Sequence, residues 1–299
     1  MKAALAALLM LVACGKGPGT EGHPDGTATP DAAGWTPLIS RSWSLTADQQ
    51  TYRCTRMQTT QEYWIDGFQS SSPVGTHHEV LTIDTNDTET GDYNCDAGSG
   101  TLSGQMVFAA GVDTDALMFP AGVAVHIPAG TWLNLNLHLF DVSDNGESGT
   151  SGVEIHTVDP ATVVNEADMT FSGTFNISVP SDGLPHTASG GCTAPTDWHL
   201  FALWPHMHQI ATHQSFQVTH NGTPDMLLDT DYQFTEQKNY PMAETVISAG
   251  DTILTTCTYV NNTGATIAFG DSSTDEMCFT GMYKYPAGSN TFDCTTGGP

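Results

Sequence analysis

The sequence is poor in positive charge. Its 299 residues include 7 lysines and arginines against 33 aspartates and glutamates, so the formal net charge at pH 7 is −26. A chain this acidic repels a phosphate backbone, which argues against binding to nucleic acid. The sequence also lacks any CxxC pair, which argues against a zinc ribbon and against a thioredoxin-like redox site.

Long apolar runs are scarce, and the clearest one lies at the N-terminus. Residues 1–14 consist of Met-Lys, a short apolar stretch and Leu-Val-Ala-Cys14, and this stretch is too short to span a bilayer. The pattern resembles a bacterial lipoprotein signal, in which Cys14 becomes the lipidated N-terminus; an ordinary secretory signal is the alternative. Residues 15–35, rich in Gly, Pro, Thr and Asp, predict a flexible linker.

These features predict where the protein is found. We expect an exported bacterial lipoprotein, in the periplasm or on the cell surface, that is monomeric and touches the membrane only through its N-terminal lipid anchor. The cysteines agree with export, because an even number remains after Cys14 and an even number implies disulfides in an exported chain. Their pairing stays open at this stage, with 15 possible connectivities, among Cys54, Cys95, Cys192, Cys257, Cys278 and Cys294.

Helical patterns are weak, whereas alternation with period 2 is common. In residues 131–140 the leucines fall on one face, and Asn134, Asn136 and His138 fall on the other, which predicts a half-buried strand. Turn signals separate this strand from further strands that we predict at 79–84, 123–127, 152–158, 169–179, 199–203, 214–220, 252–260 and 266–269.

Short strands with this punctuation predict an all-β protein made of two consecutive jelly-roll-like antiparallel β-sandwich domains. Val158-Asp-Pro160 closes one set of strands, so we expect the domains to span residues 36–162 and 163–299.

His206-Met207-His208 is the strongest local signal for a metal site. Residues i and i+2 of an extended strand point to the same face, so the two imidazoles can act as a clamp, with Met207 on the opposite face in the core. Met277, next to Cys278, is a candidate for a soft third ligand. Two imidazoles and a thioether suit copper better than zinc, calcium or magnesium.

A second set of histidines comprises His77, His78 and His138. Adjacent residues of a regular strand point to opposite faces, so His77 and His78 can share one ion only if the strand twists or bulges there. Judged alone, each motif is more simply explained by surface or core residues. Together they suggest two copper centres and oxygen chemistry.

The motifs resemble, in order, those of the copper type II ascorbate-dependent monooxygenases, which include peptidylglycine alpha-hydroxylating monooxygenase and dopamine beta-monooxygenase. The resemblance covers about residues 52–286. Its pieces are Tyr52-Arg-Cys54, Thr76-His77-His78, Leu135-Asn-Leu-His138, Ser151-Gly-Val153, Phe201-Ala-Leu-Trp-Pro-His206-Met-His208, Gly250-Asp251 to Cys257, and Ser272-Ser-Thr-Asp-Glu-Met277-Cys278.

The resemblance implies two copper ions per chain. His77, His78 and His138 would hold the electron-transfer copper, and His206, His208 and Met277 would hold the catalytic, oxygen-binding copper. It implies hydroxylation of a substrate C–H bond with O2, with electrons from ascorbate or another one-electron reductant. It further implies two sandwiches facing each other across a solvent-filled cleft, with disulfides Cys54–Cys95, Cys192–Cys294 and Cys257–Cys278.

Two further positions follow from the same resemblance. Asn136, on the strand face of His138, could orient a ligand or water near the first copper. His199 matches a family histidine near the second copper and would lie next to its ligands without binding the metal.

The sequence departs from the peptide-amidating members around the second copper. Trp204 replaces an arginine that binds the substrate carboxylate, Gly281 replaces a tyrosine that contacts the peptide, and Phe279 replaces an asparagine. These changes predict a more apolar pocket for a small aromatic or aliphatic substrate. The alternative is a non-catalytic lipoprotein that binds or buffers copper on the same fold.

Overall fold

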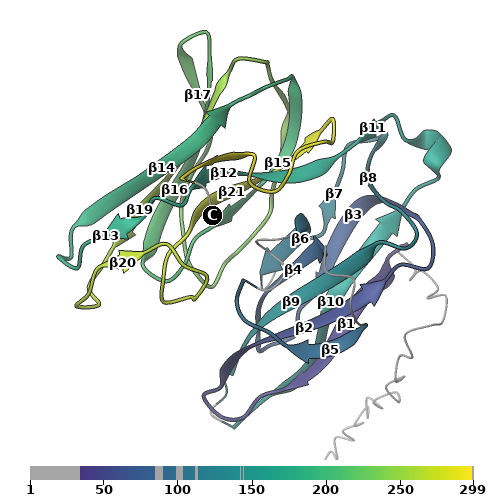
Figure 1. Ribbon diagram of the computed structural model, residues 1–299, viewed down its shortest axis with the longest axis horizontal. Helices are drawn as coiled ribbons and strands as arrows, with labels where there is room; N and C mark the ends of the chain where they lie inside the picture. Colours follow the sequence, from purple (N-terminus) through teal and green to yellow (C-terminus); the bar gives the residue numbers. More distant parts are fainter. Residues whose placement is uncertain are drawn as a thin grey trace, which may run out of the picture.

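The computed structural model describes residues 34–84, 90–98, 104–111, 114–141, 143 and 145–297. Over this part of the chain the fold is all-β, as predicted, and Figure 1 shows two β-sandwiches beside each other. The expected signal segment, Cys14 and residues 15–33 of the expected linker lie outside the described residues. Trp35, the last residue of that linker, is instead buried against His156 of the first sandwich. No helix within the described ranges is long and apolar enough to cross a membrane.

The first sandwich packs two sheets around a core that includes Phe68, Leu81 and Phe108. One sheet contains, in spatial order, β1 (Thr36–Ser44), β10 (Ser148–Thr157), β3 (Tyr63–Ser71), β8 (Val123–Ile127) and β11 (Asn165–Glu166), with β7 (Leu117–Met118) beside β3. The other contains β5 (Gly91–Asn94), β2 (Gln50–Gln58), β9 (Trp132–Phe140), β4 (Thr76–Ile83) and β6 (Gln105–Gly111).

The second sandwich is built in the same way around Trp198, Phe216 and Met282. One sheet orders β18 (Tyr240–Ile247), β15 (Trp198–His206), β21 (Cys278–Tyr285), β12 (Asp168–Thr174) and β22 (Cys294–Thr296). The other orders β14 (Pro185–Thr193), β19 (Thr252–Val260), β16 (Ala211–His220) and β17 (Thr223–Asp231), and β13 (Ser178–Val179) pairs with β20 (Ile267–Ala268).

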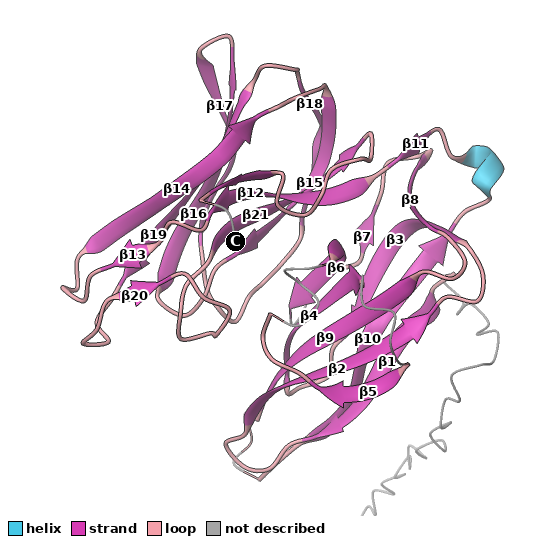
Figure 2. Ribbon diagram, in the orientation of Figure 1, coloured by secondary structure: helices cyan, strands magenta, loops and turns pink. Residues whose placement is uncertain are grey.

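A short connection joins the sandwiches. It contains a 3-10 turn, η1 (Pro160–Thr162), which Figure 2 shows in cyan. The connection stays with the first sandwich through β11, which pairs in parallel with β8. The boundary between the two sandwiches therefore lies between Glu166, the last residue of β11, and Asp168, the first residue of β12.

The strands predicted at 123–127 and 252–260 agree with β8 and β19. The strand predicted at 169–179 was wrong as a single element, because the chain forms β12 and β13 in different sheets. The cause is local: the hydroxyl of Thr174 accepts the Asn176 N–H, which turns the backbone out of the strand.

Strand β9 is buried on both faces, which corrects the expectation of a half-buried strand. Its leucines lie in the core, yet Asn134 and Asn136 on the polar face are also buried, and His138 is 1% exposed. The polar face is covered because Asn136 holds the segment after β5, donating from Nδ2 to the carbonyls of Asp96 and Ala97. Alternation of polar and apolar residues cannot predict that another segment will cover the polar face of a strand.

Three disulfides hold the sandwiches, and they are the three pairs implied by the family resemblance. Cys54–Cys95 lies in the first sandwich. Cys192–Cys294 joins β14 to β22, and Cys257–Cys278 joins β19 to β21, so each links the two sheets of the second sandwich. Disulfides of this number indicate an extracellular or exported protein.

The chain-entropy model predicts that the two inter-sheet disulfides differ in their contribution. Cys192–Cys294 spans 102 residues and Cys257–Cys278 spans 21, so they should stabilise by about 4.7 and about 3.3 kcal/mol respectively. Replacing both cysteines of a pair by serine should therefore lower the free energy of unfolding more for Cys192/Cys294. Urea unfolding without reductant measures this, and the reverse order would contradict it.

Candidate metal centres and the cavity between them

The first histidine set forms at a bulge in β4. In the pairing with β9, His78 lies opposite His138 but Thr76 lies opposite Leu139, so His77 is an extra residue at a shift of register. The bulge lets neighbouring side chains turn to one side. One ring nitrogen from each of His77, His78 and His138 lies within 4.8 Å of the other two. The irregularity required by the sequence argument is therefore present.

Burial keeps these three rings neutral. It lowers the pKa of His77 to about 4 and that of His138 to about 3, and it lowers the pKa of His78 well below its usual value. Nδ1 of His77 lies 3.0 Å from Nδ1 of His78. A neutral imidazole offers one lone pair, so nitrogens converging in this way form a ready set of metal ligands.

The His138 ring is held from two sides. Tyr52 stacks on it with ring centroids 4.4 Å apart, and the side-chain amide of Gln50 lies 2.7 Å from Nε2. Nδ1 of His138 has no hydrogen-bond partner among the described residues. Because the oxygen and nitrogen of an amide exchange places by a half-turn, Gln50 can also accept from an Nε2–H, which leaves the Nδ1 lone pair free for an ion.

His206 and His208 form the second set, at the end of a strand and just beyond it. β15 ends at His206, so the two histidines do not share a regular strand as the spacing suggested. Their rings nevertheless lie side by side, with centroids 5.3 Å apart. Met207, between them, is fully buried in the core, as predicted.

Hydrogen bonds orient both rings of this pair. Nδ1 of His206 lies 3.1 Å from Oε1 of Gln237, and Nδ1 of His208 lies 3.2 Å from the carbonyl oxygen of Asp275. Each Nδ1–H can donate to its oxygen acceptor, which leaves the Nε2 lone pair free; ligand histidines are usually held in this way. Burial lowers the pKa of His206 to about 3 and that of His208 to about 4.

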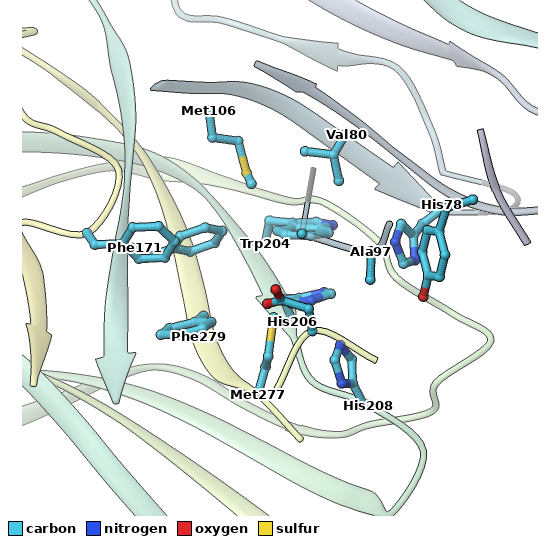
Figure 3. Close-up of a pocket in the computed structure, with 14 residues that line it drawn as sticks. His78, Val80, Ala97, Met106, Phe171, Trp204, His206, His208, Met277 and Phe279 are labelled. Carbon is cyan, nitrogen blue, oxygen red and sulfur yellow. The ribbon is translucent and has the colours of Figure 1, made fainter. Parts of the chain in front are cut away.

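Met277 reaches the same place from a separate segment. Figure 3 shows its sulfur beside the His206 ring. The buried carboxylate of Glu276 joins the two segments, because it accepts the backbone N–H groups of His208 at 2.9 Å, Ile210 at 2.9 Å and Met277 at 3.3 Å. Burial raises the pKa of Glu276 to about 7, while these hydrogen bonds act to lower it.

The two sets of side chains face each other across the junction of the sandwiches. The rings of His78 and His206 meet edge to face with centroids 6.0 Å apart. His77 packs on Phe234 at 4.1 Å, and Gly111 donates its N–H to the Gln237 carbonyl. At this point the junction is a packed contact, which differs from the solvent-filled cleft that the resemblance implied.

A small, mainly aromatic cavity opens beside this contact. Its volume is about 50 Å³, several times the 10–15 Å³ that one water molecule needs on the same measure. Figure 3 shows Phe171, Trp204 and Phe279 around it, with Met277 and His206 at one side. Trp204 stacks on His206 at 4.8 Å, so the apolar wall continues directly into the histidine pair.

Two of the three predicted pocket residues line the cavity, and the third lies outside its lining. Trp204 and Phe279 line the cavity, whereas Gly281 is not among its lining residues. A Cβ atom at Gly281 would lie 2.1 Å from Cε of Met169, so this glycine makes room for packing behind the cavity. The sequence did not identify Phe171 as a cavity residue, although it predicted its strand. Alternation with period 2 says which residues share a face of a strand, but not which strands lie beside His206, His208 and Met277.

The two predicted supporting residues lie in different surroundings. Asn136 anchors the 96–98 segment, which lines the cavity. His199 stands at the start of β15, where its Nδ1 lies 2.7 Å from Glu244 and its ring stacks on Tyr285. Seven residues of extended strand, about 23 Å, separate it from His206. The structure places Gln237, which the sequence reasoning did not single out, behind His206 instead.

Replacing Glu276 by glutamine should destabilise the protein. The amide keeps one acceptor oxygen but turns an NH2 group toward backbone N–H donors, and a buried donor left without a partner costs about 1–3 kcal/mol. Thermal unfolding of the metal-free protein measures the change. The exposed Glu236, paired with Lys238, is the matched control, and equal effects of Glu276→Gln and Glu236→Gln would contradict the assignment.

Residues 168–299 match the family model described as copper type II ascorbate-dependent monooxygenase, C-terminal domain. No curated protein gives a significant match to the chain. Among solved structures, the major capsid protein P2 from Bacteriophage PM2 is 7% identical, with 85% of this chain and 100% of that chain covered and a TM-score of 0.31.

Two further structures are similar at a low level. The infectious bursal disease virus Gx strain structure is 12% identical, with 89% of this chain and 81% of that chain covered and a TM-score of 0.19. Dimeric latent PorU from Porphyromonas gingivalis is 7% identical, with coverages of 79% and 25% and a TM-score of 0.20. TM-scores this low carry no functional information, whereas the family match spans His206, His208 and Met277 and supports a copper monooxygenase at the family level.

Proposed function

We propose that the protein is an exported dicopper monooxygenase that hydroxylates a C–H bond of a small, largely apolar molecule, using O2 and an external reductant such as ascorbate. The family match over residues 168–299 supports copper monooxygenase chemistry. The finer proposal rests on one observation: two sets of candidate metal-ligand side chains, half-buried or buried, come one from each sandwich and meet beside an apolar cavity.

The chemistry of the donors supports a different copper role in each set. We assign three imidazoles, His77, His78 and His138, to an electron-transfer copper in the first sandwich, which extends through β11. His206, His208 and Met277 are assigned to an oxygen-binding copper in the second sandwich, which begins at β12. A thioether beside two imidazoles favours Cu(I), the form that reacts with O2. When bound, copper supplies one-electron redox chemistry and oxygen activation.

The residues around the second set hold that chemistry in place. Gln237 and the Asp275 carbonyl fix the rings of His206 and His208, and Glu276 fixes the segment that carries Met277. Trp204 and Phe279 present apolar surface toward the substrate, which excludes water from the reacting C–H bond. None of these steps requires a protein nucleophile.

The cavity supports an apolar substrate rather than a glycine-extended peptide. No lysine or arginine is found among the described residues that line it. A peptide carboxylate placed there would be desolvated without a cationic partner, which is costly. Phe171, Phe292 and Met106 complete an apolar lining suited to an aromatic or aliphatic group.

Export and anchoring form a separate part of the proposal. Disulfides require an oxidising compartment. We propose that residues 1–14 direct export and that Cys14 carries the lipid, with a linker that starts at residue 15 and ends before the buried Trp35. Mass spectrometry of the mature N-terminus tests this, and an unmodified N-terminus downstream of Cys14 would contradict lipidation.

Copper titration tests the two centres independently of any substrate. The wild-type protein should bind two Cu(I) ions per chain, while His138→Ala and His208→Ala should each retain one. His213, a surface histidine on β16 paired with Asp229, is the matched control, and His213→Ala should still bind two. Metal analysis after desalting gives the counts. A wild-type protein that retains no copper would refute the proposal.

Replacing Met277 by isoleucine tests catalysis. We expect the variant to keep the first copper, to lose the copper–sulfur signal in X-ray absorption, and to hydroxylate at background rate. Met226→Ile, on the exposed face of β17, should behave like the wild type. Oxygen uptake and mass spectra of products from a mixture of aromatic and aliphatic compounds provide the readout.

The outcomes also separate the alternative function. Two bound copper ions with no oxygen uptake and no hydroxylated product would indicate a copper-binding or copper-buffering lipoprotein. Efficient alpha-hydroxylation of a glycine-extended peptide would contradict the apolar substrate, and normal turnover by Met277→Ile would contradict the assignment of Met277.

A further inference from the structure

The segment that carries Met277 contacts both sandwiches, the second through its base and the first through its tip. We call residues 270–277 the Met277 loop. The base of the loop is tied to the second sandwich. The Glu276 carboxylate accepts the backbone N–H groups of His208 and Ile210, and the Glu276 backbone N–H donates to the Ala268 carbonyl. Cys278, the next residue, is bonded to Cys257.

The tip of the loop, residues 271–273, rests on the first sandwich. Ser273 is 4% exposed, and its hydroxyl accepts a hydrogen bond from Nε2 of Gln50 at 2.9 Å. Gln50 begins β2, and the same nitrogen lies 2.7 Å from Nε2 of His138. One amide therefore touches both a histidine of the first metal set and the loop of the second.

A second contact joins the same surfaces. Asp271 packs so closely on Gly98 that a Cβ atom at Gly98 would lie 2.2 Å from Oδ2 of Asp271. Both residues line the cavity. The tip of the Met277 loop thus packs against residues 96–98. Asn136 of β9, near His138, holds those residues through hydrogen bonds to the carbonyls of Asp96 and Ala97.

We infer that Gln50 is a positioning residue that joins His138 to the Met277 loop, so that docking of the first sandwich sets the position of Met277. His206 is oriented by Gln237, whose backbone carbonyl accepts the N–H of Gly111 from the first sandwich. His208 is oriented by the Asp275 carbonyl, which belongs to the Met277 loop itself. Gln50 contacts this loop through Ser273, so its contact bears on the position of Met277 and of the Asp275 carbonyl together. The metal part of this inference rests on the proposed function, whereas the coupling between Gln50 and the loop does not.

Hydrogen exchange of the metal-free full-length protein tests the coupling. In Gln50→Leu the backbone amides of the loop should exchange about threefold to tenfold faster, the effect of losing one net hydrogen bond. Two of these amides, Asp275 and Glu276, make hydrogen bonds within the loop or to its base, so they report on its seating. Because Gln50 is an exposed side chain, its replacement should leave the sandwich folded.

Gln58→Leu is the matched control. Gln58 is also exposed, ends the same strand and donates to the Gly130 carbonyl away from the junction. Exchange in the loop should match the wild type. Gly98→Ala, which pushes on Asp271, should accelerate exchange as Gln50→Leu does.

X-ray absorption of the Cu(I)-loaded protein supplies a second readout. Gly98→Ala should bind as much copper as the wild type but with a weaker copper–sulfur signal, because its added methyl group pushes on Asp271 of the Met277 loop. Unchanged loop exchange in both Gln50→Leu and Gly98→Ala would overturn the inference. If the wild-type protein bound no copper, the proposed function would fail, while the exchange result would still decide the coupling.

Discussion

The packed contact between the two sandwiches is the constraint on which the candidate site depends. His78 and His206 come from different sandwiches and meet edge to face, 6.0 Å between ring centroids. Such a contact removes water from the rings, and burial then holds their pKa values far below the usual range. Neutral imidazoles that are shielded from solvent keep a lone pair that a soft metal ion can use.

The fold divides its histidines into two kinds by their surroundings. At the junction His138, His206 and His208 are buried and His77 and His78 are half-buried, and desolvation lowers the pKa of all five. The other histidines of the described ranges each pair with a carboxylate: His126, His156, His186, His199, His213 and His220. In a chain with so few lysines and arginines, carboxylates find histidine as a partner at the surface. The residue type alone therefore says little, and burial decides which histidines can act as ligands.

Much of this arrangement follows from local patterns. The alternation in residues 131–140 predicted β9 and the direction of its leucines, and the all-β class followed from such alternation and from the turn signals. The adjacency of His77 and His78 required an irregular strand, and the bulge at His77 provides it. The division of 169–179 into two strands escaped this reasoning, because a single threonine hydroxyl turns the chain there.

Other features depend on contacts between distant segments. Gln237 lies 31 residues beyond His206, yet it orients that ring. Gln50 and Ser273 are 223 residues apart in the chain and share a hydrogen bond. Gly281, expected in the pocket, instead accommodates Met169 behind it. No spacing rule links these residues, because their proximity results from sheet order and from the docking of one sandwich on the other.

The sequence by itself therefore determined the class of fold, the types of the candidate ligands and the apolar character of Trp204 and Phe279 in the pocket wall, because these depend on residue chemistry and short-range periodicity. Tertiary structure alone decided that the two candidate ligand sets meet, that His199 stands apart from them, and that the Gln50 amide touches both His138 and the loop that carries Met277. These properties depend on which surfaces pack together, and packing joins residues without regard to their distance along the chain.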